Sequence, residues 1–147
     1  MRTVIQRVKE AEIWIDSERF SQIDRGLLIL FGCRHGDQEG STVWLAEKIL
    51  NLRIFEDAEQ KMNLSLLEIS GQIMVVSQFT LYADSRKGRR PAFTEAMEPV
   101  EAERLYNAFV ARIRSSGLTT QTGVFGAKME VKLTNDGPVT ILLDHDL

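Results

Sequence analysis

Apolar and polar side chains alternate along the first third of the chain in the manner of β-strands. The apolar positions are β-branched and have polar residues between them: Val4, Val8, Ile13 and Ile15. Two further strands are expected over Arg19–Ile23 and Leu27–Cys33, divided by a turn at Asp24-Arg25-Gly26. The run Leu27–Phe31 is apolar at every position, which predicts a central strand covered on both faces.

Two stretches have apolar residues at three- and four-residue spacing, typical of helices that bury one face. The first is expected to run from Asp37, as its cap, to about Leu52, with the apolar stripe Val43, Leu45, Ala46, Ile49, Leu50 and Leu52. The second is expected to start near Pro99, a favoured first-turn residue, and to end at Gly117. Its stripe consists of Ala102, Leu105, Tyr106, Phe109, Val110 and Ile113.

The remaining segments predict more strands. Residues 53–70 are mixed and indicate one or two short strands or turns, and 72–78 is a strongly apolar, partly β-branched strand. Residues 129–133 alternate as a half-buried strand does, and 139–143 form a final strand. Between these last two, Asn135-Asp136-Gly137-Pro138 reads locally as a hairpin turn.

Strands that follow one another as hairpin-like neighbours, with only two helices between them, predict an α+β fold. We expect one domain over residues 1–147, with largely antiparallel sheet and both helices on one face. The composition is ordinary for a globular protein, at 44% hydrophobic and 27% charged residues. Because Cys33 is the only cysteine, neither an internal disulfide nor a cysteine-based metal site is expected.

Charge and hydropathy bear on location and partners. No apolar run approaches the ~20 residues of a membrane span, and the N-terminus enters strand-like sequence directly, so a cytoplasmic protein without a membrane partner is expected. A net charge of −3 argues against a general nucleic-acid binder, including a DNA binder. A local basic run nevertheless exists at Arg86, Lys87, Arg89 and Arg90, and it is either a solvated loop or a contact for an acidic partner.

Few side chains are suited to acid–base catalysis. His35 lies in a polar turn and His145 near the C-terminus, neither beside a nucleophile in the sequence, so a Ser-His-Asp triad is not expected. Cys33 ends a predicted core strand, which favours a small buried hydrophobe over a nucleophile. Metal-ligand spacings and glycine-rich phosphate loops are absent from the sequence, so no metal and no cofactor is predicted.

Polar residues follow the most apolar predicted strand, in the segment Ser77-Gln78-Phe79-Thr80-Leu81. Where a chain leaves a strand, backbone N–H groups can point at a ligand, and each oxyanion-hole donor contributes about 2.7–4 kcal/mol to transition-state stabilisation. Thr80 would be a nucleophile only with a base beside it. From this segment alone an ordinary strand end is the simpler interpretation. Taken singly, Arg7 and Met129 are likewise ordinary core or surface residues.

Taken together and in order, these segments resemble the D-aminoacyl-tRNA deacylase family nearly from end to end. Ser77–Leu81 matches the family's S-Q-x-x-L motif, and Asn135–Thr140 matches its N-x-G-P-x-T motif without a departure. Weaker similarities accompany them at Val4–Val8, Arg53–Phe55, Lys61–Leu64, Gly88–Phe93, Gln121–Phe125 and Met129.

The resemblance implies a barrel-like deacylase fold, a homodimer, and hydrolysis of the ester between a D-amino acid and the 3′ end of tRNA. It implies a catalytic pocket formed by Ser77, Gln78, Phe79 and Thr80, with backbone oxyanion donors near the last two. It also implies chirality selection by Gly137, Pro138, Arg7 and Met129. In the family, the Gly-Pro bond is cis and enters the partner subunit's site, where its carbonyl oxygens reject L-amino acids at the α-carbon.

The resemblance also bears on the lack of an obvious side-chain general base. The family view assigns part of the catalysis to the 2′-hydroxyl of the terminal adenosine of the tRNA. An older view makes Thr80 the nucleophile. The basic run Arg86, Lys87, Arg89 and Arg90 is then expected to contact acceptor-stem phosphates. Two alternatives remain open: editing of wrong L-amino acids or glycine on tRNA, and a non-enzymatic dimeric RNA-binding module.

Overall fold

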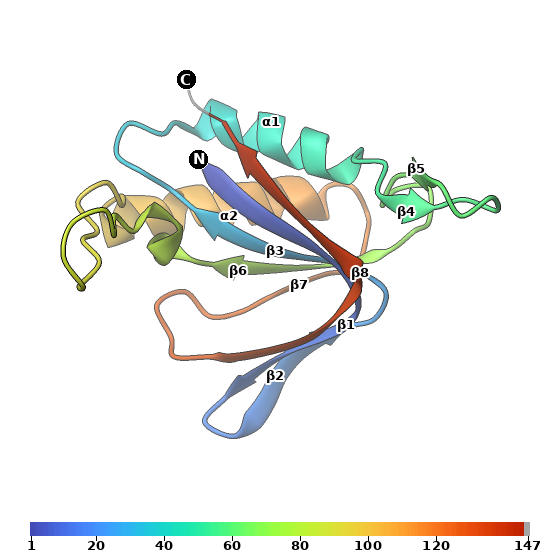
Figure 1. The fold of residues 1–147 in the computed structure, drawn as a ribbon, viewed down its shortest axis with the longest axis horizontal. Coiled ribbons are helices and arrows are strands. Elements are labelled where there is room, and N and C mark those ends of the chain that lie inside the picture. The colour runs from blue at the N-terminus through green and yellow to red at the C-terminus, as the bar shows by residue number, and fades with distance from the viewer. Residues whose placement is uncertain (146–147) are drawn as a thin grey trace.

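A computed structural model of the chain describes residues 1–145, which form a curved sheet with two helices on one side (Figure 1). The main sheet has the strand order β2 (Glu18–Ile23), β1 (Arg2–Ile15), β3 (Gly26–Gly32), β6 (Gln72–Ser77) and β7 (Thr120–Thr122). A sixth strand, β8 (Glu130–Asp144), also pairs with β1. The three partners of β1 are antiparallel to it, whereas β6 is parallel to β3 and β7.

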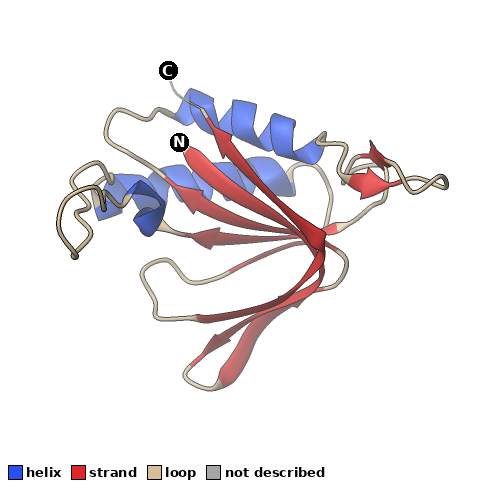
Figure 2. Ribbon diagram, viewed as in Figure 1, coloured by secondary structure: helices blue, strands red, loops and turns tan. Residues whose placement is uncertain are grey.

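The length of β1 makes the sheet fold over on itself. Its first half, Arg2–Val8, pairs with β3, and its second half, Ala11–Ile15, pairs with β2. Strand β8 follows both halves from Arg2 to Trp14, so the β1–β8 pair bends from one part of the sheet into the other (Figure 2). The predicted α+β class, barrel-like and largely antiparallel, is confirmed.

Both helices, α1 (Glu39–Leu50) and α2 (Pro99–Arg114), cover the same face of the sheet, as predicted (Figure 1). Their apolar stripes pack on the sheet residues that point toward them, and the rings of Phe31 and Phe109 stack with centroids 4.7 Å apart. On the other face of β3 and β6, a second apolar cluster fills the space enclosed by the folded sheet: Val8, Ala11, Ile13, Ile23, Leu28, Met74 and Val76. The central strand β3 is therefore covered on both faces, as its apolar run predicts.

Short elements complete the fold. The hairpin strands β4 (Phe55–Glu56) and β5 (Met62–Leu64) lie in the segment expected to hold one or two short strands. A 3₁₀ helix, η1 (Phe79–Tyr82), follows β6 directly. No helix within residues 1–145 is long and apolar enough to cross a membrane.

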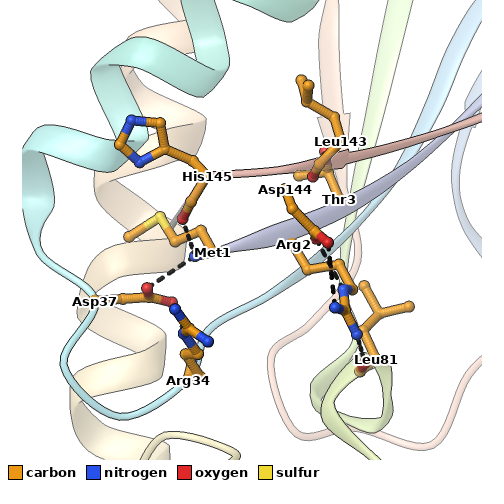
Figure 3. Close-up of polar contacts among 9 residues, drawn as sticks. All are labelled: Met1, Arg2, Thr3, Arg34, Asp37, Leu81, Leu143, Asp144 and His145. Atoms are coloured by element: carbon orange, nitrogen blue, oxygen red, sulfur yellow. Dashed lines mark hydrogen bonds and ion pairs between the residues drawn. The ribbon is translucent and has the colours of Figure 1, made fainter. Parts of the chain in front are cut away.

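The predicted cap of the first helix is wrong. Asp37 lies before α1, whose first residue is Glu39 and whose N-cap, Gln38, makes no side-chain cap hydrogen bond. The Asp37 carboxylate instead accepts hydrogen bonds from the Met1 ammonium group and from the backbone N–H of Arg34, each at 2.8 Å (Figure 3). A buried ammonium group requires a charged partner, so the carboxylate is engaged there.

The predicted hairpin turn at Asn135–Pro138 is also wrong. Strand β8 continues through this segment, and both flanks pair with β1, as Asn135 with Val8 and Thr140 with Gln6. Residues 136–139 therefore stand opposite a single residue, Arg7, and form a bulge. A turn and a bulge use the same residue types, and only the identity of the pairing strand distinguishes them.

Candidate active site

A cavity of about 460 Å³ opens where β3 and β6 end. Its walls come from four separated parts of the chain: residues 31–33 at the end of β3, residues 76–79 at the end of β6, residues 97–106 before and within α2, and the segment 125–131 before and within β8. The volume is within the range of small-molecule sites. The lining includes Ser77, Gln78, Phe79 and Met129, so the fold brings these four predicted site residues together.

The chain leaves the sheet abruptly at this cavity. The backbone N–H of Gln78 still donates to the carbonyl oxygen of Phe31, at 2.7 Å, and η1 begins at the next residue. Phe79 and Thr80 are the first residues of η1, so their N–H groups have no acceptor within the helix. The Thr80 hydroxyl accepts a hydrogen bond from the Gln78 side-chain amide. An amide N–H cannot take a proton, so this contact does not activate Thr80.

Arg2 fixes the far end of η1. Its guanidinium donates to the Leu81 carbonyl oxygen at 2.9 Å and to both carboxylate oxygens of Asp144, at 2.8 and 3.1 Å (Figure 3). It also lies over the Tyr82 ring, 5.1 Å from the centroid. The 3₁₀ helix η1 is thus held between β6, which it follows, and the paired strands β1 and β8.

Two titratable groups in the cavity wall are held in their protonated forms. Burial raises the pKa of the Cys33 thiol to about 12, so the reactive thiolate is scarce at neutral pH and the prediction of a buried hydrophobe is confirmed. Burial also raises the pKa of Tyr106 to about 12, and its hydroxyl donates to the Val75 carbonyl oxygen at 2.8 Å. Neither histidine lines the cavity, and the His145 ring packs at a tilt against Trp44 of α1, with centroids 4.5 Å apart.

Arg7 is the centre of a second group of predicted site residues. Its side chain is 5% exposed, and it donates to the carbonyl oxygens of Asp136, at 2.8 Å, and Ile54, at 2.6 Å. The carboxylates of Asp136 and Glu56 lie 3.6 and 3.8 Å from the guanidinium. Arg7 therefore ties the bulge of β8 to the segment that precedes β4.

Hydrogen bonds between Asn135 and Val139 also join the two ends of the bulge. The Asn135 side chain accepts from the Val139 N–H at 2.7 Å and donates to the Val139 carbonyl oxygen at 3.1 Å. The Gly137–Pro138 bond is cis. Gly137 has a φ of +150°, and a Cβ there would lie 2.7 Å from the Val139 nitrogen and 2.8 Å from its Cγ2. Only glycine fits this position, and both Gly137 and Pro138 remain exposed.

The two groups do not meet within one chain, since neither Arg7 nor the Gly137–Pro138 bulge lines the cavity. Thr80 adjoins the lining residue Phe79 without lining the cavity itself. The basic run is on the loop between η1 and α2, where Arg86 pairs with Asp84 at 2.8 Å and holds the pKa of that carboxyl well below its usual range.

Part of the cavity wall was missed from the sequence. Tyr106 was assigned only to a helix stripe, Cys33 only to a strand, and Met97, Gly126 and Ala127 were not singled out. No local pattern marks these residues, because their common feature is proximity in space. The family resemblance did include Phe125.

Comparison with known proteins bears on what this cavity does. The family model described as D-Tyr-tRNA(Tyr) deacylase matches residues 4–144. The chain belongs to this family. D-aminoacyl-tRNA deacylases from Myxococcus xanthus and an Exiguobacterium species are 56% and 54% identical to it, over 98% and 99% of this chain and 94% and 99% of theirs. The predicted membership of this hydrolase family is confirmed.

Two solved structures share the fold of this chain. A protein described as a c-Myc DNA unwinding element binding protein has a TM-score of 0.94 and 39% identity, with both chains covered completely. A probable eukaryotic D-amino acid tRNA deacylase has a TM-score of 0.83 over 98% of each chain. At 18% identity, this second likeness supports the fold alone.

Proposed function

We propose that this protein hydrolyses the ester bond between a D-amino acid and the 3′ end of tRNA, with release of the free D-amino acid and the tRNA. The family match over residues 4–144 carries the proposal. The cavity supports it, because it offers backbone N–H groups at the start of η1, near Phe79 and Thr80, to a carbonyl oxygen that becomes negative as water attacks. A cytoplasmic location accords with a tRNA substrate.

We further propose that chirality is selected by exclusion at the α-carbon. An attractive side-chain pocket would have to accept many D-amino acids, so it could not separate mirror images efficiently. The bulge around Gly137 and Pro138 is suited to exclusion, since Arg7 and Asn135 hold it through backbone atoms. Met129, in the cavity wall, would complete the surface that faces the substrate.

This selection requires a second copy of the chain, because the exposed bulge and the cavity are separate within one copy. An apolar row supports a homodimer: Val4 pairs with Leu30 on one side and Leu142 on the other, on the sheet face away from the helices. Leu142 is 60% exposed there. In the proposed dimer, the bulge of each subunit enters the cavity of its partner.

Hydrolysis of three matched substrates tests the function. D-tyrosyl-tRNA and glycyl-tRNA, including glycine on the alanine tRNA, are expected to be deacylated, and L-tyrosyl-tRNA to be spared. Glycine has no side chain to exclude, so it passes the proposed filter. Cleavage of L-tyrosyl-tRNA would favour an enzyme that edits L-amino acids, and inertness toward all three would favour an RNA-binding module. Resistance of glycyl-tRNA alone would refute exclusion at the α-carbon.

Thr80→Ala tests the route of the reaction. We propose that the 2′-hydroxyl of the terminal adenosine assists, since the only side-chain partner of the Thr80 hydroxyl within residues 1–145 is an amide donor. The variant is then expected to retain most of its kcat, whereas loss of a catalytic nucleophile costs about a million-fold. D-tyrosyl-tRNA ending in 2′-deoxyadenosine should be hydrolysed poorly by both forms. Near-complete loss in a folded Thr80→Ala protein would instead make Thr80 the nucleophile.

A further inference from the structure

Two aromatic side chains lie exposed at the edge of the cavity. Phe79 is 57% exposed and Phe93 is 39% exposed, and their rings meet edge to face with centroids 5.0 Å apart. Phe79 also lines the cavity, so the pair continues the cavity wall outward. Exposed aromatic surface of this kind is typical of binding sites.

Both rings are on anchored backbone. Phe93 follows Ala92, which exchanges two backbone hydrogen bonds of 2.8 and 2.9 Å with Asp84 across the base of the loop. The Phe93 carbonyl oxygen accepts from Ala96, which is bridged to Arg34. In Figure 1 this loop lies beside η1, at the left of the molecule. The pair is thus presented by a fixed part of the loop.

The tip of the same loop is strongly basic. Lys87, Arg89 and Arg90 are exposed, and within residues 1–145 their side chains make no ion pair. This is a local excess of positive charge on a chain whose net charge is −3. In a symmetric contact between two copies these cations would face the same cations of the other copy, and like charges across an interface are unfavourable, so a second copy of the chain is a poor occupant of this surface.

Cations beside exposed aromatic rings bind unpaired nucleic acid, because phosphates meet the charges and bases stack on the rings. We propose that Phe79 and Phe93 form a stacking platform for the unpaired nucleotides that precede the terminal adenosine of tRNA, with Lys87, Arg89 and Arg90 on their phosphates. The inference rests on the proposed function, which brings that adenosine to the cavity. Phe93 does not line the cavity that holds the reacting ester, so its side chain contributes to binding of the polynucleotide alone.

Phe93→Ala tests the platform, since the Phe93 side chain has no role in the proposed chemistry. The KM for D-tyrosyl-tRNA is expected to rise about ten-fold, the usual effect of losing one stacked base. Hydrolysis of 3′-O-(D-tyrosyl)adenosine, which lacks the preceding nucleotides, is expected to be unchanged. Phe93→Trp should restore the KM, because it keeps an aromatic face. Phe20→Ala removes a more exposed ring, 52% exposed and on β2, and as the matched control it should change the hydrolysis of neither substrate.

Replacement of Lys87, Arg89 and Arg90 by glutamine is expected to lower the salt dependence of tRNA binding by a slope of about two, at ~0.7 per phosphate contact. Phe93→Ala should leave that slope unchanged, since stacking releases no counterions. An unchanged slope in the triple variant, or an unchanged KM for tRNA in Phe93→Ala, would overturn the platform. A KM raised equally for both substrates would make Phe93 part of the cavity instead.

Sedimentation velocity tests whether a second copy of the chain occupies this surface instead of RNA. Dissociation of the Phe93→Ala protein into monomers would assign the surface to a contact between copies and refute the inference. Failure of the proposed function is distinguishable. If the wild type hydrolyses neither substrate, binding of a fluorescent single-stranded RNA to wild type and Phe93→Ala still decides the platform. Equal affinities would overturn it, and weaker binding by the variant would support it.

Discussion

Arg7→Met is expected to remove both stability and selectivity. The substitution leaves the carbonyl oxygens of Ile54 and Asp136 without their donor, and each unsatisfied buried group costs about 1–3 kcal/mol. We expect a loss of about 2–5 kcal/mol in the free energy of unfolding, measured by urea denaturation. The bulge at residues 136–139 loses its anchor, so the preference for D- over L-tyrosyl-tRNA should fall at least about ten-fold, a change of ~1.4 kcal/mol.

Two variants separate these effects. Arg19→Met removes an arginine whose ion pair with Glu12, at 3.1 Å, is half exposed, and exposed pairs contribute at most about 1 kcal/mol. Arg19→Met should change neither the free energy of unfolding nor the preference for D- over L-tyrosyl-tRNA. Arg7→Lys keeps the buried charge but cannot reach both carbonyl oxygens as a planar fork does. It should therefore fold and still lose selectivity. An Arg7→Lys protein with the wild-type preference would show that the guanidinium does not position the bulge.

Gly26→Ala is expected to have the largest effect on folding. A Cβ at this position would lie 1.8 Å from the Gln72 carbonyl oxygen and 2.7 Å from its backbone nitrogen and carbon. Backbone atoms cannot move aside as a flexible side chain does, so the pairing of β3 with β6 must open at this end. We expect a loss of at least ~3 kcal/mol, a large part of the ~5–15 kcal/mol of a typical domain. Thermal unfolding monitored by circular dichroism provides the measurement.

Gly40→Ala is the matched control, because no atom lies within 4 Å of its ideal Cβ. This glycine is in α1, where alanine is favoured by about 1 kcal/mol, so the variant should be more stable than the wild type. A Gly26→Ala protein that unfolds at the wild-type temperature would show that the two strands can separate without cost. Since β3 and β6 end at the cavity, folded Gly26→Ala protein should also be less active.

Sequence periodicity was sufficient to predict a helix or strand wherever the physical cause of that element is local. The stripes of both helices and the apolar run of β3 follow from which faces must be removed from water, and the structure agrees with them. The order of segments was also sufficient to assign the family, because two motifs and several weaker similarities occur along one chain.

Only the tertiary structure decided those features of the fold that depend on which distant segment a residue contacts. Gly26 reads as a turn residue, but it is required by the approach of Gln72, 46 positions later. Asp37 reads as a helix cap, but the Met1 ammonium group takes its carboxylate. The bulge at residues 136–139 reads as part of a hairpin turn, because its residue types suit both structures, and only the pairing of both flanks with β1 distinguishes them. Each of these cases turns on a neighbour that is distant in the sequence and close in space.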